Sequence, residues 1–215
     1  MKKFATCNAQ AVLKAGLTGL LLSTLATSAL AQRGAVQPEA HAGQQPVNNL
    51  PNPYETQRNF GSLPDGRSWG SVSAVDIDPD GIHVWAGDRC GSNSCANSDV
   101  DPIVKLDPNG RVVESFGANQ IIWPHGMDVD ADGNVWVADA RLANARELEA
   151  NPDAANRGNV VLKFSPTGEL LMTLGTPGEM GDPPTHFTEP NDVLVAPSGR
   201  IFVVETHSAQ FQDEP

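Results

Sequence analysis

Short apolar runs alternate with turn residues along most of the chain, and the order of the runs is repeated. The first unit comprises residues 75–81, 82–86, 103–110 and 111–117. Asp-Gly, Asn-Gly, Thr-Gly or Ser-Gly pairs separate the runs within the units. Runs of β-branched and aromatic residues joined by such turns are typical of antiparallel hairpins. The pattern therefore predicts four short antiparallel strands in each unit.

The second unit comprises residues 127–133, 134–137, 160–168 and 169–175, and a third begins at residue 193 and continues to residue 204. Four strands for every 40–50 residues or so, lengthened here by insertions, is the period of a propeller blade. A β-sandwich also has short strands but does not repeat one four-strand order. We therefore predict an all-β fold, a partial β-propeller of about two and a half blades over residues 70–215.

The number of blades is too small for a closed ring, which needs roughly four to eight. Gln210 to Pro215 occupy the place where the third strand of the third unit would start. The sequence therefore looks truncated, and we expect an unpaired strand edge that favours association.

The first 31 residues resemble a secretory signal. Lys2 and Lys3 precede an apolar run, and the small-x-small sequence at residues 29–31 suits cleavage. An N-terminal membrane anchor is the alternative, but Thr and Ser within the run favour cleavage. We expect a periplasmic or secreted protein with no stable membrane anchor after processing.

Residues 32–69 are rich in Gln, Pro, Asn and Gly, which favours an exposed linker and lead-in segment. Two cysteines remain after the signal, Cys90 and Cys95, and four residues separate them. In an oxidising compartment this spacing favours a disulfide that closes a small loop. A metal site is the weaker alternative because no second cysteine pair exists.

The charge of the chain argues against one class of partner. Lys and Arg number 14 against 26 Asp and Glu, which gives a net charge of −12. Phosphate backbones repel so acidic a chain, so nucleic-acid binding is excluded as a working hypothesis.

The predicted blades bring distant segments to one rim, because the first strand starts on the face where the second strand ends. The segments at these places carry the ionisable side chains of Asp88, Arg89, His125, Asp139, Arg141, Glu205 and His207. Loops at one end of a rigid scaffold commonly carry function. We therefore expect a site at this rim, with a small-molecule or peptide substrate in the central channel. The sequence does not indicate an oligomeric state.

His125 is the sharpest candidate at this rim. Neutral imidazole is a good zinc ligand, and Pro124 and Gly126 favour a tight, exposed turn around it. A structural histidine is the alternative. The aspartates before Gly81 and Gly133 suggest a calcium loop at first sight, but they lack the other EF-hand ligands and fit hairpin turns.

One string extends the argument to a known family. Residues 122–139, Ile-Trp-Pro-His-Gly-Met-Asp-Val-Asp-Ala-Asp-Gly-Asn-Val-Trp-Val-Ala-Asp, resemble NHL-type propeller repeats and, more specifically, the peptidyl-α-hydroxyglycine α-amidating lyases. Residues 72–78, 88–91 and 186–195 support the match, which covers about residues 70–208. The resemblance implies a six-bladed propeller with a structural calcium and a zinc in its channel. It also implies cleavage of a peptidyl-α-hydroxyglycine to a peptide amide and glyoxylate.

Carried over by position, the resemblance assigns His125 as one of three zinc histidines and the carbonyls of Val75 and Met127 as calcium ligands. It assigns Arg89 as a catalytic arginine. His207 stands where the lyases have their catalytic tyrosine. The remaining zinc histidines and the calcium carboxylate have no counterpart in this sequence, so we expect no activity from these residues alone.

Three functions follow as hypotheses. The first is a metal-dependent carbon–nitrogen lyase in which His207 serves as the base, since its ordinary pKa near 6.5 suits neutral pH. The second is an NHL-like propeller that binds a ligand or protein without chemistry. The third, a propeller hydrolase of the lactonase type, requires a carboxylate-rich metal site for which Glu205 alone is a thin basis.

Overall fold

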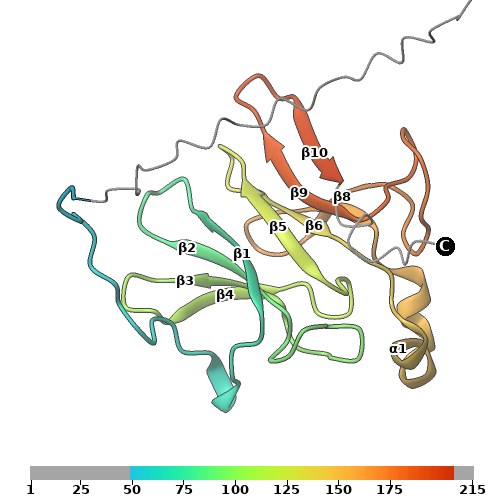
Figure 1. Cartoon of the computed structure of the whole chain (residues 1–215), viewed down its shortest axis with the longest axis horizontal. Coiled ribbons are helices and arrows are strands. Elements are labelled where there is room, and N and C mark those ends of the chain that lie inside the picture. The colour runs from blue at the N-terminus through green and yellow to red at the C-terminus, as the bar shows by residue number, and fades with distance from the viewer. Residues whose placement is uncertain (1–48, 206–215) are drawn as a thin grey trace, which may run out of the picture. The chain divides into compact units, whose positions relative to one another are not determined.

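Figure 1 shows the computed structural model of the chain, which describes residues 49–205. The predicted signal at 1–31, the start of the lead-in segment and the predicted base His207 lie outside the described residues. The chain divides into two units, 1–53 and 54–215. The account below concerns residues 54–205 of the second unit.

Ten antiparallel strands form three sheets in sequence order (Figure 1). The first sheet contains β1 (Val72–Ile77), β2 (Val84–Asp88), β3 (Ile103–Leu106) and β4 (Val112–Phe116). The second contains β5 (Pro124–Val129), β6 (Val135–Asp139), β7 (Val160–Phe164) and β8 (Leu170–Leu174). The third contains β9 (Pro190–Val195) and β10 (Ile201–Glu205). The prediction of an all-β fold with two and a half four-stranded blades is confirmed.

The first hairpin turns of the two complete sheets form where Asp-Gly pairs occur. The aspartate two residues before each pair contacts the two strands that follow. Asp78 accepts hydrogen bonds from the Asp80 amide and from the indole of Trp85, and it pairs with Lys105 at 2.6 Å. The second sheet repeats this arrangement with Asp130, Trp136 and Lys163. These aspartates are therefore parts of hairpin turns, as the sequence predicted, and they hold three strands of a blade together.

Helical structure is confined to short segments between the strands. Within residues 54–205 these are η1 (Pro64–Gly66), α1 (Ala145–Ala150) and η2 (Pro152–Asn156). Asn144 begins α1 with a capping box, because its side chain accepts from the Glu147 amide while the Glu147 side chain accepts from the Asn144 amide. None of the helices in this described part is long and apolar enough to cross a membrane.

The sheets pack through their first strands, β1, β5 and β9, which lie side by side (Figure 1). Carboxylates bridge these strands. Asp76 on β1 accepts from the Val129 amide on β5 at 2.7 Å, and Asp128 on β5 accepts from the Val195 amide on β9 at 2.9 Å. Each blade is thus hydrogen-bonded to the next at the same position of its inner strand.

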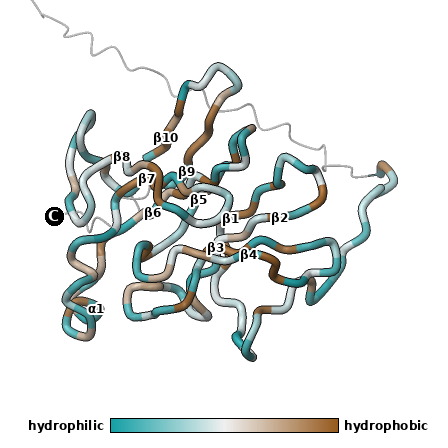
Figure 2. The backbone as a smooth tube through the Cα atoms, turned by 180° about the vertical axis from the view of Figure 1, so that it is seen from behind, coloured by the Kyte–Doolittle hydropathy of each residue, from teal (hydrophilic) through white to brown (hydrophobic). Residues whose placement is uncertain are grey.

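Apolar side chains fill the space between successive sheets. Trp85 contacts Phe116 and Phe116 contacts Phe164 as tilted ring pairs, with centroids 5.4 and 5.1 Å apart, and these rings join the first sheet to the second. A second cluster around Trp136 and Val193 joins the second sheet to the third. Figure 2 shows the hydrophobic residues concentrated on the strands and the hydrophilic residues in the connections. The core is therefore a series of layers between blades.

The end of the lead-in segment packs on the first sheet. Residues 54–60 are exposed, but Leu63 is buried against Ala86 and Val104. The Ser62 amide donates to the Gly110 carbonyl at 2.9 Å, which fixes the segment to the β3–β4 turn.

Candidate functional site

The inner strand of each sheet carries a β-bulge at an equivalent position. Pairing shifts by one residue between Val72 and Ala74 on β1 and between Pro124 and Gly126 on β5, and the same shift occurs on β9. The extra residues are Ser73, His125 and Asn191. A bulge changes the direction in which the side chain of its extra residue points, and bulges are frequent next to active sites. All three residues line one cavity of about 270 Å³, together with Val75, Met127 and Asp192.

The geometry of His125 fixes its tautomer. Its Nδ1 lies 2.9 Å from the carbonyl oxygen of Asn191, on the neighbouring inner strand. Because a carbonyl oxygen only accepts, Nδ1 carries a hydrogen, and in the neutral imidazole the lone pair is then on Nε2. Metal-binding histidines commonly donate their second ring nitrogen to a backbone carbonyl in this way. His125 therefore has the form that a zinc ligand needs.

Trp123 connects His125 to Arg89. The indole and imidazole centroids are 5.1 Å apart, and the Arg89 guanidinium carbon lies 3.6 Å from the indole centroid. Arg141 lies near the same ring, at 5.8 Å. Cation–π contacts of this kind stabilise a guanidinium over an aromatic face. The sequence prediction that His125 and Arg89 share one rim therefore agrees with this arrangement, although it gave Trp123 no role.

Arg89 is buried, with 6% of its surface exposed, and its guanidinium is held on three sides. Nε donates to the Pro124 carbonyl at 3.1 Å, Nη1 to Asn93 Oδ1 at 2.6 Å and Nη2 to Ser73 Oγ at 3.2 Å. Burial, with a smaller contribution from the charge of Arg141, lowers the pKa of Arg89 to about 10. The side chain is therefore still a cation at neutral pH.

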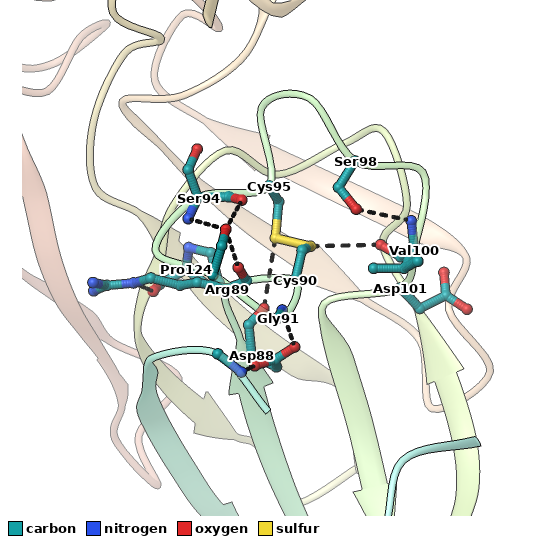
Figure 3. Close-up of a disulfide and its surroundings, with 12 residues drawn as sticks. Asp88, Arg89, Cys90, Gly91, Ser94, Cys95, Ser98, Val100, Asp101 and Pro124 are labelled. Atoms are coloured by element: carbon teal, nitrogen blue, oxygen red, sulfur yellow. Dashed lines mark hydrogen bonds between the residues drawn. A yellow bond between two sulfur atoms is a disulfide. The ribbon is translucent and has the colours of Figure 1, made fainter. Parts of the chain in front are cut away.

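Cys90 and Cys95 form a disulfide next to Arg89, with their Cα atoms 5.2 Å apart (Figure 3). The prediction from their spacing is confirmed. The Cys95 amide donates to the Ile122 carbonyl at 2.8 Å, so the small loop is attached to the segment that leads into β5. The loop thus stands between the end of β2 and the start of β5.

The acidic residues of the predicted rim have structural roles. Asp88 and Asp139 are fully buried at the ends of β2 and β6. Asp88 accepts from the Gly70 amide at 2.6 Å, and Asp139 accepts from the Ile122 and Trp123 amides at 2.9 and 2.6 Å. Glu205 accepts from the Thr188 amide in the same way. Each carboxylate fastens the backbone that precedes an inner strand.

These contacts perturb the acids unequally. Burial raises the pKa of Asp139 to about 6, although its two backbone hydrogen bonds oppose the shift. Arg141 is paired with Glu147 on α1 through two contacts of 2.8 Å, and this guanidinium is the main reason that the pKa of Glu147 falls to about 2. The rim therefore presents fewer free carboxylates than its sequence suggested.

Val75 and Met127 lie at equivalent positions of the adjacent strands β1 and β5 and line the cavity that holds His125. Their role as carbonyl ligands of calcium stays a prediction. No group of three His, Cys, Asp or Glu side chains that could hold a metal ion occurs within residues 49–205. Among residues 49–205, His125 is the only histidine that lines this cavity.

Comparison with characterised proteins identifies relatives of one kind. The chain is 33% identical over 150 residues to peptidyl-glycine alpha-amidating monooxygenase of Mus musculus, which covers 62% of this chain and 14% of that protein. It is 27% identical over 167 residues to a probable peptidyl-alpha-hydroxyglycine alpha-amidating lyase of Caenorhabditis elegans, and this alignment covers 71% of this chain and 43% of that protein. Peptidyl-alpha-hydroxyglycine alpha-amidating lyase 2 of Drosophila melanogaster is 25% identical over 154 residues, and this alignment covers 64% of this chain and 34% of that protein. The chain thus spans less than half the length of each of these relatives.

No family model matches the chain. Among solved structures, the hydrazine synthase of Kuenenia stuttgartiensis has a TM-score of 0.41 and 13% identity over 64% of this chain and 30% of that one. A gluconolactonase of Xanthomonas campestris has a TM-score of 0.40 and 15% identity over 66% of this chain and 39% of that one. We base no functional argument on likenesses of this size.

Proposed function

We propose that this chain, whose homologues are α-amidating lyases, provides part of an active site for the cleavage of peptidyl-α-hydroxyglycine. The C–N bond of the carbinolamide breaks, the hydroxyl proton leaves, and the amide nitrogen gains a proton. The products are a peptide amide and glyoxylate. The observation that carries the proposal is the row of contacts from His125, which lines the cavity, through Trp123 to Arg89, in a part of the chain that is similar to the lyases.

His125 would contribute Nε2 to a zinc site, and the carbonyl oxygens of Val75 and Met127 would contribute to a structural calcium site. A zinc ion held there would supply a Lewis acid for an oxygen of the substrate and for the negative charge that develops on it. The hydrogen bond from Nδ1 to the Asn191 carbonyl holds the imidazole in the ligating tautomer. His125 therefore has a positioning partner on the neighbouring blade.

Arg89 would bind the carboxylate of the α-hydroxyglycine and stabilise charge as the glyoxylate leaves. Three of its N–H groups are held by Asn93, Pro124 and Ser73, and a guanidinium has five. The fixed donors and the stacked indole leave the remaining N–H groups in one orientation. A preorganised cation of this kind stabilises developing charge without reorganising during the reaction.

We assign the proton transfer to His207 as a hypothesis from its position in the sequence. A neutral imidazole could accept the hydroxyl proton while the C–N bond breaks. We also propose export to the periplasm or beyond, because the leader resembles a signal and the Cys90–Cys95 disulfide favours an oxidising compartment.

One experiment tests the lyase function directly. The complete protein that carries this sequence is loaded with zinc and incubated with N-benzoyl-α-hydroxyglycine, and glyoxylate is measured. We expect release of glyoxylate, and at least a hundredfold loss for Arg89→Ala and for His125→Ala. His83→Ala is the matched control, because His83 lies on the β1–β2 turn and pairs with Asp80. No glyoxylate above the uncatalysed rate would overturn the proposal.

A binding propeller without chemistry is the second candidate. Two observations favour it: residues 49–205 contain no group of three metal-ligand side chains, and the carboxylates at the ends of β2 and β6 are engaged with the backbone. In that case the protein would bind N-benzoyl-α-hydroxyglycine in calorimetry without converting it. The same acids leave little support for a carboxylate-rich hydrolase site.

A further inference from the structure

We propose that Asn93, on the disulfide-closed loop 90–95, is a positioning residue that sets the orientation of the Arg89 guanidinium over Trp123. The role of that guanidinium in turnover rests on the proposed function, but its orientation does not. The loop is thus a part of the site that neither the sequence pattern nor the family resemblance assigned.

The contact between Asn93 and Arg89 is the shortest of the three hydrogen bonds that hold the guanidinium. Nη1 lies 2.6 Å from Asn93 Oδ1, against 3.1 Å for the bond to Pro124 and 3.2 Å for the bond to Ser73. All three bonds have the charged guanidinium as donor, so all three are charge-assisted. Asn93, with the shortest of them, therefore provides the strongest constraint on rotation of the guanidinium.

The other contacts restrain one torsion only weakly. Rotation about the Nε–Cζ bond exchanges the two Nη groups, and the hydrogen bond from Nε to the Pro124 carbonyl does not oppose it. Of the two hydrogen bonds that do oppose it, the one from Nη2 to Ser73 Oγ is the longer, at 3.2 Å. Loss of Asn93 would leave this rotation opposed by the Ser73 bond and by the indole of Trp123, which covers one face of the guanidinium.

The loop is built so that Asn93 stays in place although its own surface is exposed. The disulfide closes the loop, and the Ser71 amide donates to the Ser92 carbonyl at 2.8 Å. Gly70 approaches so closely that a Cβ there would lie 2.5 Å from the Ser92 nitrogen and oxygen. Figure 3 shows the loop folded back beside Asp88, with the Arg89 side chain extending past Pro124.

The first test is a double-mutant cycle on the complete, zinc-loaded protein. We expect Asn93→Ala to lower kcat/KM for N-benzoyl-α-hydroxyglycine about tenfold, since small misplacements of a positioned group are costly. Asn93→Asp keeps an acceptor oxygen and should recover most of the rate. In the Arg89→Ala background, Asn93→Ala should have no further effect. The matched control is Asn97→Ala, an exposed asparagine just outside the loop.

An equal loss from Asn93→Ala in both backgrounds would overturn the proposal, because Asn93 would then act through something other than Arg89. An equal loss from Asn97→Ala would do the same by pointing to a general disturbance of the region.

The second test does not depend on turnover. In ¹⁵N spectra of arginine side chains, a guanidinium that is held gives separate Nη–H signals, and a freely turning one gives averaged signals. The signals of Arg89 are assigned by their loss in Arg89→Ala. We expect separate signals in the unmodified protein and in Asn93→Asp, and averaged signals in Asn93→Ala.

The two tests separate the two proposals. Unchanged Arg89 signals in Asn93→Ala would refute the positioning role, whatever the rate. Averaged signals together with no glyoxylate from any variant would support the positioning role and remove the lyase function.

Discussion

At the residue scale, carboxylates that look alike in the sequence have different environments. Asp107 lies in the β3–β4 turn and accepts from Arg111, mainly through the backbone amide, so its pKa is lowered to about 2. Asp139 is fully buried, and desolvation raises its pKa to about 6. The same side chain therefore changes stability with pH in opposite directions at the two positions.

Asp139 gives a prediction about pH. Between about pH 4 and pH 6 its native carboxyl keeps a proton that the unfolded chain has released, because the ordinary pKa is 3.8. The free energy of unfolding should therefore fall as the pH rises through this window, by up to about 3 kcal/mol from this group. Urea unfolding at intervals of half a pH unit measures the effect.

Asp139→Asn isolates this contribution from acids with lowered pKa values, such as Asp107 and Glu147, which act below about pH 4.5. The asparagine has one acceptor oxygen for two backbone amides, so the variant should be less stable near pH 4. Its stability should stay level between pH 4 and 6. A parallel fall in both proteins would show that another group is responsible.

At the element scale, the small disulfide loop should stabilise the chain by restricting the unfolded state. For a loop of this length the chain-entropy model gives about 2 kcal/mol. We expect Cys90→Ser combined with Cys95→Ser to lower the free energy of urea unfolding by about this amount. A reducing agent should lower the stability of the unmodified protein equally and leave the double variant unchanged. A further loss in the double variant would contradict the assignment.

The strands were predictable from the sequence because their turn residues are local signals. The run at 75–81 became β1 and its turn, and the run at 160–168 became β7 and its turn. Helix α1 was not predicted, since it lies in an insertion, although Asn144 and Glu147 have the spacing of a capping box. The bulges were beyond reach because pairing across two strands creates them, and neither strand alone records the register.

The candidate site was predictable only in part. His125 stood out because Pro124 and Gly126 flank it, and the rim placed it near Arg89. The roles of Trp123 and Asn93 depend on stacking and on the closed loop, which sequence spacing does not encode. The buried positions of Asp88 and Asp139 likewise follow from contacts with backbone amides far along the chain.

At the scale of the whole partial propeller, the junction between the second and third sheets depends on a close approach of the inner strands β5 and β9. A Cβ at Gly126 would lie 2.5 Å from the Asn191 carbonyl oxygen and 2.6 Å from Asp192 Cα, and would collide with the Asp192 side chain. Backbone atoms cannot move aside as a flexible side chain can. Position 126 of β5 therefore has room for glycine but not for a residue with a Cβ atom, unless the backbone moves.

We predict that Gly126→Ala lowers the free energy of unfolding by about 1–3 kcal/mol, because it forces the second and third sheets apart. Gly181→Ala is the control, since the nearest neighbours of its Cβ would be atoms of the His186 side chain, at 3.2 Å. Thermal unfolding followed by circular dichroism compares the two. Equal midpoints for both variants would show that the strands can separate at little cost.

The bulge that presents Ser73, His125 and Asn191 also bears on how new chemistry could arise in this architecture. The direction of each side chain comes from one extra residue in the inner strand, so the strand pairing is the same whether that residue is serine, histidine or asparagine. A single codon change could then exchange a hydroxyl, an amide or an imidazole in the cavity lining while the strand pairing of the sheets stays the same. Blades of this architecture can therefore differ in the chemistry of one cavity-lining side chain per repeat without a change of fold.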